Sequence, residues 1–295
     1  MILRVGLIGL GIMGSAYAGH LIGAGFSTVA YDLDPAALER YKLRGGNPAV
    51  SAKGVAANSD VIVVALASAS AVEDALFGAD GVANGVGAGS VILDMGTFPL
   101  ELKRSIRERF VGHGASVLDT PVSGTGSQAA TRDLVVFASG DEAAFEKSRA
   151  VLDAFARDVR YVGEFGNGSK LKYIANLLVT IHNLSTAEAM VLAEKAGIDG
   201  TMLLDMLGES AASSRMMQVR GPMMAEHRYE PATMRLEVYQ KDLDIIEAFA
   251  KSLDCPTPLF SASLPFYAGA IAEGRGKEDT AAIVTVLRER AGLAP

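Results

Sequence analysis

Short apolar segments alternate with helix-like segments along the first half of the chain. The apolar segments have the length of buried strands, and this arrangement is typical of a parallel sheet covered by helices on both faces. Asp34 and Pro35 are the expected cap and first turn of the helix after the second strand. The expected strands are Leu3–Ile8, Thr28–Asp32, Asp60–Leu66, Ser90–Met95, Ala115–Asp119, Leu134–Ala138 and Arg157–Val162.

After Gly168 the strand pattern ends and only helical patterns follow. The expected helices are Ser169–Ala196, Thr201–Leu207, Gln240–Leu253, Leu259–Glu273 and Thr280–Ala291. The change predicts an α/β domain over residues 1–165 and an all-α domain over residues 166–295, joined by a long helix. Helices rich in Ala, Met and Leu carry more apolar surface than one small helical domain needs. We therefore expect a homodimer or a homotetramer.

Composition excludes several classes of protein. The chain has 295 residues and a net charge of −7, so a nucleic-acid partner, which requires a dense basic stripe, is not expected. Apolar residues make up 49% and charged residues 21%, which excludes disorder as the main state. One cysteine, Cys255, cannot form an internal disulfide, and the spacing of the four histidines predicts no metal site.

The longest stretch without Asp, Glu, Lys or Arg runs from Val5 to Tyr31. Its glycines argue against a membrane-spanning helix. Arg4, the apolar run and the small residues at 16–18 fit a signal peptide loosely. Cleavage there would remove the glycine motif described next. We therefore expect a cytoplasmic protein with no membrane partner.

The segment 9–14, Gly-Leu-Gly-Ile-Met-Gly, is a G-x-G-x-x-G motif between an expected strand and an expected helix. Its glycines permit a tight turn and a close approach to a pyrophosphate, whose charge meets the helix N-terminus. The expected cofactor contacts in this turn are Gly9, Gly11, Ile12, Met13 and Gly14. The alternative is a structural turn.

Asp32 ends the second strand, about where a carboxylate binds the adenosine ribose. A carboxylate there accepts hydrogen bonds from ribose hydroxyls and repels a 2′-phosphate. Leu33 adds no cation, so NAD is favoured over NADP. Arg40 and Lys42 could weaken this preference but are expected on a solvated helix face.

Lys172 and Asn176 lie four residues apart in the expected long helix and share one face, to which Asn183 returns. Gly168, one turn earlier, is expected to leave room for a ligand. A lysine in a partly dry cleft suits proton transfer in carbonyl–alcohol chemistry. The alternative is a lysine on a solvated face. Neighbouring apolar residues indicate a largely buried helix; these are Leu171, Tyr173, Ile174, Leu177 and Leu178.

With these motifs placed, the chain resembles the β-hydroxyacid dehydrogenase family, the 3-hydroxyisobutyrate dehydrogenase-like enzymes. The similarity extends over nearly the whole length and implies a Rossmann-type dinucleotide-binding domain followed by a helical substrate and oligomerisation domain. Four segments carry it together: the glycine motif 9–14, Asp119-Thr120-Pro121-Val122-Ser123-Gly124, Gly168 through Lys172 to Asn176, and Lys241-Asp242-Leu243 with residues 274–279 further on.

The resemblance implies a role for each matching position. Lys172 would be the general acid/base on the reacting oxygen, and Asn176 would orient the substrate. Ser123 and Gly124 would hold the substrate carboxylate, with Thr125 in the same loop. Three further positions would lie near the cofactor: Leu66, Thr97 and, beside the substrate as well, Lys241. Family members that use NADP tend to have an Arg where this chain has Leu33, which again favours NAD.

Two departures from the family pattern fall in the substrate loop. Thr125 stands where a second glycine is usual, and it is expected to narrow the pocket. Arg132 replaces the glycine of an expected Gly-x-Leu. Arg132 is either a cation at the substrate mouth, which would favour a substrate with a second anionic or polar group, or an exposed loop residue. The particular substrate is therefore left open.

The sequence thus predicts NAD-dependent oxidation of a small β-hydroxy acid, or the reverse reduction of a semialdehyde or keto acid, without a metal ion. An imine reductase of the same fold is the runner-up. Many of those enzymes lack a lysine at the catalytic position, so Lys172 argues against it. A third alternative is a non-catalytic protein that senses the NAD/NADH ratio; Lys172, Asn176 and Ser123 together argue against that interpretation.

Overall fold

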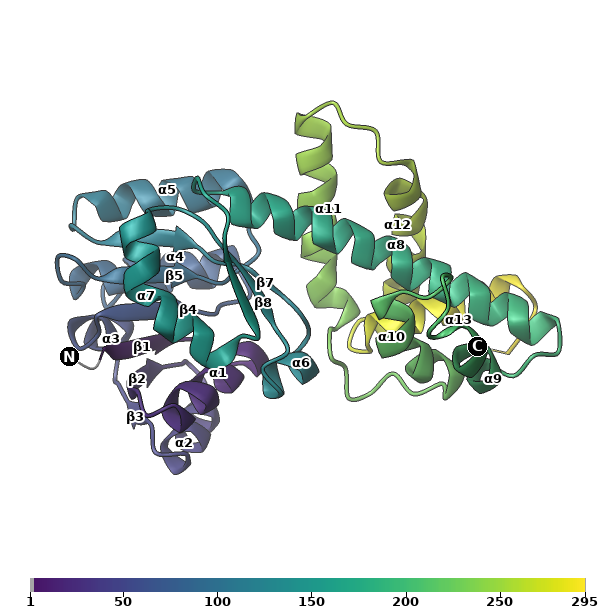
Figure 1. Ribbon diagram of the computed structural model, residues 1–295, viewed down its shortest axis with the longest axis horizontal. Helices are drawn as coiled ribbons and strands as arrows, with labels where there is room; N and C mark the ends of the chain where they lie inside the picture. Colours follow the sequence, from purple (N-terminus) through teal and green to yellow (C-terminus); the bar gives the residue numbers. More distant parts are fainter. Residues whose placement is uncertain (1–2, 295) are drawn as a thin grey trace. The chain divides into compact units, whose positions relative to one another are not determined.

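The computed structural model describes residues 3–294, which fold as two compact units that divide after Lys172, within one long helix (Figure 1). The first unit holds a six-stranded parallel sheet of order β3-β2-β1-β4-β5-β6. The strand order reverses between β1 and β4, where parallel sheets of this type bind ligands. The strands are β1 Arg4–Ile8, β2 Ser27–Tyr31, β3 Asn47–Pro48, β4 Val61–Val64, β5 Val91–Asp94 and β6 Ser116–Asp119.

Alternate residues of the central strands enter two separate cores. Val61 and Val63 of β4 pack on one face with Tyr17 and Phe155, whereas Ile62 and Val64 pack on the other face. This alternation explains why the strands read as continuous apolar runs. The covering helices are α1 Ile12–Gly23, α2 Pro35–Leu43, α3 Ala52–Ala57, α4 Ala69–Phe77, α5 Leu100–Val111, α6 Gly126–Ala130 and α7 Glu142–Phe155.

The structure shows what becomes of the expected Asp34-Pro35 helix cap and of the uncharged stretch Val5–Tyr31. The carboxylate of Asp34 accepts a hydrogen bond from the Ala36 N–H (2.9 Å), and Pro35 is the first residue of α2, which confirms the expected cap. The uncharged stretch Val5–Tyr31 forms most of β1, all of α1 and β2. Within residues 3–294, no helix combines the length and apolar character needed to cross a membrane.

The last two predicted strands do not join the main sheet. They form a small second sheet of order β7-β8-β9, in which β7 Val122–Ser123 is antiparallel to β8 Val135–Ala138, and β9 Asp158–Tyr161 is parallel to β8. The chain continues past the end of β6 in the same direction, so that Asp119 forms an antiparallel bridge with Ser139 in register with β7 and β8, and it reverses direction only between β7 and β8. The two-residue strands β3 and β7 are too short to leave a periodic signal in the sequence.

The second unit is helical. It contains most of α8 Asn167–Lys195, followed by α9 Gly200–Leu207, α10 Arg215–Ala225, α11 Leu236–Ser252, α12 Pro258–Ala270, a π-helical turn Ile271–Arg275, a 3₁₀ turn Thr280–Ala282 and α13 Ile283–Arg290. Helix α10 was not predicted because Gly221 and Pro222 interrupt its pattern. Gly221 lets Leu204 of α9 pack closely, since a Cβ there would lie 2.5 Å from a Leu204 methyl.

One expectation about α8 is wrong. Leu171, Ile174 and Leu178 are exposed, Ile174 by 52%, although Tyr173 is buried. Residues 171, 174 and 178 fall on one side of an α-helix, roughly two fifths of a turn from the face that carries Lys172 and Asn176. The apolar composition of this segment therefore reflects two different faces, of which only one is buried.

Candidate functional site

The glycine turn after β1 has the backbone geometry that requires glycine. Gly9 has φ +92°, and a Cβ there would lie 2.5 Å from the Ala65 carbonyl oxygen. A Cβ on Gly14 would lie 2.0 Å from the Gly9 carbonyl oxygen, so Gly14 allows α1 to begin tightly against β1. Gly11 differs, because a Cβ there would meet no atom within 4 Å. The turn is thus closed at Gly9 and Gly14 and open at Gly11.

The N-terminus of α1 next to Gly11 fits the phosphates of a dinucleotide. Gly11 offers no capping side chain, and no acidic residue occupies the first turn. Ile12 is exposed and Met13 half-buried at this helix start. The first N–H groups of a helix without a cap attract a phosphate through both hydrogen bonding and the helix dipole. The open space beside Gly11 and this uncapped terminus are what a bound pyrophosphate requires.

Asp32 follows β2 and holds the glycine turn. Its carboxylate accepts hydrogen bonds from the Leu10 N–H (2.5 Å) and the Asp34 N–H (2.8 Å). Sequence reasoning assigned Asp32 to the ribose and did not foresee these backbone contacts. Leu33 beside it is 82% exposed. The carboxylate therefore lies at the turn, and its contact with a ribose stays a prediction.

Leu66 and Thr97 follow β4 and β5 at the carboxyl edge of the parallel sheet, the edge from which the glycine turn also emerges. Both are half-buried. A Leu66 methyl lies close enough to Gly9 that a Cβ at Gly9 would approach it to 2.9 Å. The structure thus brings Leu66 to the glycine turn and places Thr97 on the next strand along the same edge.

The Ser123-Gly124-Thr125 loop is held by the start of α6. Gly124 has φ +141°, and a Cβ there would lie 2.4 Å from a Leu134 methyl. The N–H of Thr125 donates to Gln128 Oε1 (3.0 Å), and its hydroxyl lies 2.9 Å from the Ser127 hydroxyl. Thr125 is buried while Ser123 and Gly124 are half-buried. Thr125 therefore caps α6, a role that accounts for the residue without a substrate contact.

The side chain of Arg132 binds helix α7 of the same unit. Its guanidinium donates to the carbonyl oxygen of Asp153 in α7 (2.9 Å), and its backbone has φ +62°. Gln128 Nε2 donates to the neighbouring Asp133 carboxylate (3.0 Å). These contacts favour the interpretation of Arg132 as an exposed loop residue.

Gly168 does not leave room for a ligand, contrary to the expectation. A Cβ at Gly168 would lie 2.3 Å from the Phe137 carbonyl oxygen and 3.0 Å from that of Asp119. The space that a side chain would occupy is filled by backbone of the Phe137 and Asp119 strands, which packs directly against the first turn of α8. Gly168 thus sets the position of the helix that carries Lys172.

Lys172 and Asn176 lie one turn apart on α8, as predicted; Lys172 is half-buried and Asn176 is buried. The Asn176 amide donates to Asp242 Oδ2 (2.9 Å). The other oxygen of Asp242 accepts from Lys241 Nζ (2.8 Å). One buried carboxylate therefore holds Asn176 and also binds Lys241. Sequence reasoning named both of these residues but gave no role to Asp242, whose only signal was its place between Lys241 and Leu243.

Asn183 lies on the Lys172 face of α8, but its side-chain amide forms hydrogen bonds within the second unit. Its amide donates to the Tyr267 hydroxyl (3.0 Å) and to the Thr280 carbonyl oxygen (2.9 Å). The Thr180 hydroxyl donates to the Asn176 carbonyl oxygen (2.8 Å) and lies 2.9 Å from the Tyr239 hydroxyl. Burial raises the pKa of Tyr267 to about 12 and that of Tyr239 further, so both stay protonated.

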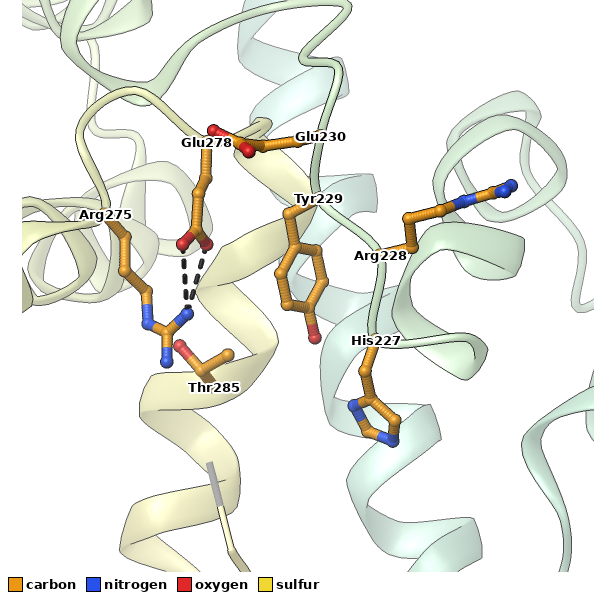
Figure 2. A pocket seen from close by; sticks show the side chains of 7 residues that line it. All are labelled: His227, Arg228, Tyr229, Glu230, Arg275, Glu278 and Thr285. Carbon is orange, nitrogen blue, oxygen red and sulfur yellow. Dashed lines mark hydrogen bonds and ion pairs between the residues drawn. The ribbon is translucent and has the colours of Figure 1, made fainter.

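A separate cavity of about 390 Å³ opens in the second unit (Figure 2). Two charged residues of its lining are paired with each other, since Arg275 Nη1 lies 3.3 and 3.1 Å from Oε1 and Oε2 of Glu278. Burial raises the pKa of Tyr229 to about 12. None of the residues expected to bind cofactor or substrate lines this cavity; its lining is His227, Arg228, Tyr229, Glu230, Arg275, Glu278 and Thr285. In residues 3–294, no group of three His, Cys, Asp or Glu side chains could hold a metal.

Comparison with known proteins identifies the family. Residues 4–163 match the NAD binding domain of 6-phosphogluconate dehydrogenase, and residues 166–287 match the NAD-binding domain of NADP-dependent 3-hydroxyisobutyrate dehydrogenase. L-threonate dehydrogenase of Haemophilus influenzae is 36% identical over 96% of this chain and 94% of its own. The chain belongs to the 3-hydroxyisobutyrate dehydrogenase-like family of β-hydroxyacid dehydrogenases. It is an oxidoreductase with an NAD(P)-binding domain.

Solved structures agree with this assignment. The crystal structure of 3-hydroxyisobutyrate dehydrogenase from Salmonella typhimurium matches with a TM-score of 0.89 and 34% identity, covering 96% of this chain and 99% of that one. An imine reductase variant from Myxococcus stipitatus matches with a TM-score of 0.63 and 21% identity, covering 97% of this chain and 100% of that one. The second likeness shows a shared fold alone.

Proposed function

We propose that this protein oxidises a small β-hydroxy acid with NAD as the preferred cofactor, or catalyses the reverse reduction, with Lys172 as general acid/base. The observation that carries the proposal is the pairing on α8 of half-buried Lys172 with buried Asn176, whose amide is fixed by Asp242. Bound nicotinamide supplies the hydride chemistry. The protein's own task is then to move one proton and to hold the acid.

Lys172 is proposed to transfer the proton. In oxidation the neutral amine accepts the proton of the substrate hydroxyl, and in reduction the ammonium returns a proton to the carbonyl oxygen. Asn176 lies one turn further along α8 and orients the same substrate oxygen. Asp242 fixes the amide of Asn176, because its Oδ2 accepts one of the two amide hydrogens. Lys241 shares that carboxylate and is proposed to lie near both substrate and cofactor.

The carboxylate of the substrate is assigned to the Ser123-Gly124 segment. Ser123 ends β7 with a half-buried side chain, and Gly124 follows with φ +141°. A hydroxyl and a backbone N–H from one turn suit an anionic oxygen. Thr125 is proposed to border the same site, although its own groups are engaged with α6.

The preference for NAD rests on Asp32 and Leu33. A carboxylate at the end of β2 favours ribose hydroxyls and repels a 2′-phosphate, and the exposed Leu33 offers no cation to it. Gly9, Gly11, Ile12, Met13 and Gly14 form the proposed phosphate turn, with Leu66 and Thr97 along the same sheet edge. We further propose that the protein is a homodimer or homotetramer in the cytoplasm and has no nucleic-acid or membrane partner.

A substrate screen tests this function. The purified protein is assayed with NAD⁺ and with NADP⁺ against L-threonate, 3-hydroxyisobutyrate and other small 3-hydroxy acids, including sulfonates and phosphonates, and with the reduced cofactors against the matching carbonyl acids and a cyclic imine. Turnover of a hydroxy acid with NAD⁺ supports the proposal. Turnover of the imine alone identifies an imine reductase. Cofactor binding without any turnover identifies a sensor of the NAD/NADH ratio.

A further inference from the structure

A lysine with no place in the proposed chemistry is buried inside the first unit. Lys103 lies on α5, and 0% of its side chain is exposed. Its Nζ lies 2.7 Å from Asp119 Oδ1 and 3.4 Å from Asp94 Oδ2. A buried lysine is rare unless it is paired, and its charge is costly to keep there. Burial alone would lower the pKa of Lys103, but the two carboxylates outweigh it and raise the pKa, so the amine stays charged.

Asp94 connects this lysine to the segment expected to line the cofactor. It is the last residue of β5, and its Oδ1 accepts a hydrogen bond from the Gly96 N–H (3.0 Å). Lys103 also donates to the Asp94 carbonyl oxygen (3.4 Å). Thr97 follows Gly96 directly. The buried ammonium thus holds both the backbone and the side chain at the start of this turn.

Asp119 connects the same lysine to the catalytic helix. Asp119 Oδ2 accepts from the Ser169 N–H (2.7 Å), and Oδ1 accepts from the Ser169 hydroxyl (2.7 Å) as well as from Lys103. The Ser139 hydroxyl accepts from the Gly168 N–H (3.0 Å) and donates to Asp119. A carboxylate at the end of β6 therefore caps α8, a role that usually falls to a residue beside the helix.

We propose that the buried Lys103–Asp119 pair is a positioning device that fixes the first turn of α8, and with it the amine of Lys172, relative to the Asp94–Thr97 segment. The inference rests on the proposed role of Lys172, which lies three residues after Ser169. Its physical basis is geometric. The helix start is packed against backbone through Gly168 and is held by a carboxylate whose own position is set by Lys103. A buried ion pair adds little stability over apolar side chains of similar volume, whereas its directional bonds define one position.

Two substitutions loosen this connection in different ways. Ser169→Ala removes the hydroxyl donor to Asp119 Oδ1 and keeps the backbone N–H bond. Asp119→Asn keeps the shape but cannot accept from Lys103 and from both Ser169 groups together. Ser148→Ala is the matched control, because within residues 3–294 the hydroxyl of this buried serine bonds only to carbonyl oxygens of its own helix α7, those of Ala144 and Phe145. If Asp119→Asn does not fold, Ser169→Ala still decides the question.

The readouts are kcat, the dissociation constant of NADH measured by fluorescence, and the titration midpoint of the Lys172 amine. That midpoint is followed by NMR after reductive ¹³C-methylation and is assigned with Lys172→Arg. We expect Ser169→Ala and Asp119→Asn to lower kcat by about tenfold or more, with unchanged NADH binding and a displaced Lys172 midpoint. Ser148→Ala should change neither kcat nor the Lys172 midpoint. A lower melting temperature with unchanged kcat and an unchanged midpoint overturns the inference, because the pair would then only stabilise the fold.

Lys172→Ala separates this inference from the proposed function. Normal turnover in Lys172→Ala removes the proposed function, whatever Ser169→Ala does. Loss of turnover in Lys172→Ala together with normal kcat and an unmoved midpoint in Ser169→Ala removes only the positioning role.

Discussion

The amide of Asn176 in α8 donates a 2.9 Å hydrogen bond to the carboxylate of Asp242 in α11. Both side chains are buried, and the second oxygen of Asp242 binds Lys241. A buried carboxylate that accepts from an amide and from an ammonium fixes both donors in one arrangement. Two residues assigned to the substrate by family resemblance are therefore connected by a third.

Asp242→Asn tests this connection. Asn176 and Lys241 donate to different oxygens of Asp242, and an amide keeps only one of these two acceptor oxygens, so the variant cannot accept from both residues in their present positions. We expect kcat/KM to fall by about 10²-fold, the cost of a small displacement at a reacting centre. Steady-state kinetics on the substrate found in the screen measure it, with circular dichroism to confirm folding. Asp244→Asn, an exposed position on the same helix, is the control and should leave kcat/KM unchanged.

The cofactor preference is tested by Leu33→Arg. An arginine at this exposed position after Asp32 supplies the cation that a 2′-phosphate needs. One charge-assisted hydrogen bond contributes about 1.5–3 kcal/mol, and about 1.4 kcal/mol corresponds to tenfold. The ratio of kcat/KM for NADP⁺ to that for NAD⁺ should therefore rise about tenfold. Leu43→Arg, at another exposed leucine, should not change the ratio; an equal rise there would argue against a role for residue 33.

The close packing at the start of α8 predicts that Gly168→Ala is destabilising. The new Cβ would press on the carbonyl oxygens of Phe137 and Asp119, which are backbone atoms that cannot turn away. We expect a loss of about 1–3 kcal/mol in the free energy of unfolding, together with reduced activity. Chemical denaturation measures the loss. Gly23→Ala at the exposed end of α1, where a Cβ meets nothing, should be neutral or slightly stabilising.

Asp279 predicts a pH dependence of stability. Burial alone would raise its pKa, but Arg220 and hydrogen bonds from Thr233, Ala281 and Met234 outweigh burial and hold the pKa below the usual value. A lowered carboxyl pKa stabilises the fold above the unfolded-state value near 3.8, and that stability is lost as the pH falls below it.

Asp279→Asn should therefore cost about 3–5 kcal/mol at neutral pH, because it leaves Arg220 buried without its counter-charge. The difference from wild type should narrow as the pH falls below about 4. Urea denaturation at several pH values measures this difference. If the difference in unfolding free energy between Asp279→Asn and wild type stays constant at acidic pH, the stabilising role of the Asp279 carboxylate is contradicted. Asp205→Asn, at an exposed site of the same unit, is the control and should unfold with the same free energy as wild type.

The main sheet and most helices were predictable because their signals are local. Continuous apolar runs such as Val61–Val64 and the Asp34-Pro35 cap report burial and helix starts within a few residues. The small second sheet was not predictable, since it depends on a two-residue strand and on an antiparallel pairing between segments that are separated by α6. The exposed face of α8 was also missed, because apolar composition does not tell which side of a helix is covered.

The candidate site shows the same division. Lys172 and Asn176 could be paired from helical spacing alone, and the glycine turn could be recognised from its context. The partners that hold them could not. Asp242, Lys103 and Asp119 lie far from α8 in the sequence, and their roles depend on contacts that appear only when the chain is folded. The role of Gly168 was misjudged for the same reason, since the space beside it is filled by a distant backbone.

Lys172→Ala, with Lys170→Ala as its matched control, tests the proposed chemistry most directly. Lys170 lies two residues away on the same helix and binds Asn167 instead (3.1 Å). Single-turnover formation of reduced cofactor is measured for both variants, with cofactor binding determined separately. Lys172→Ala should bind NAD as wild type does and lose at least about 10²-fold in rate, while Lys170→Ala stays close to wild type. Near-normal turnover in Lys172→Ala would contradict the assignment of Lys172 as the proton-transferring group.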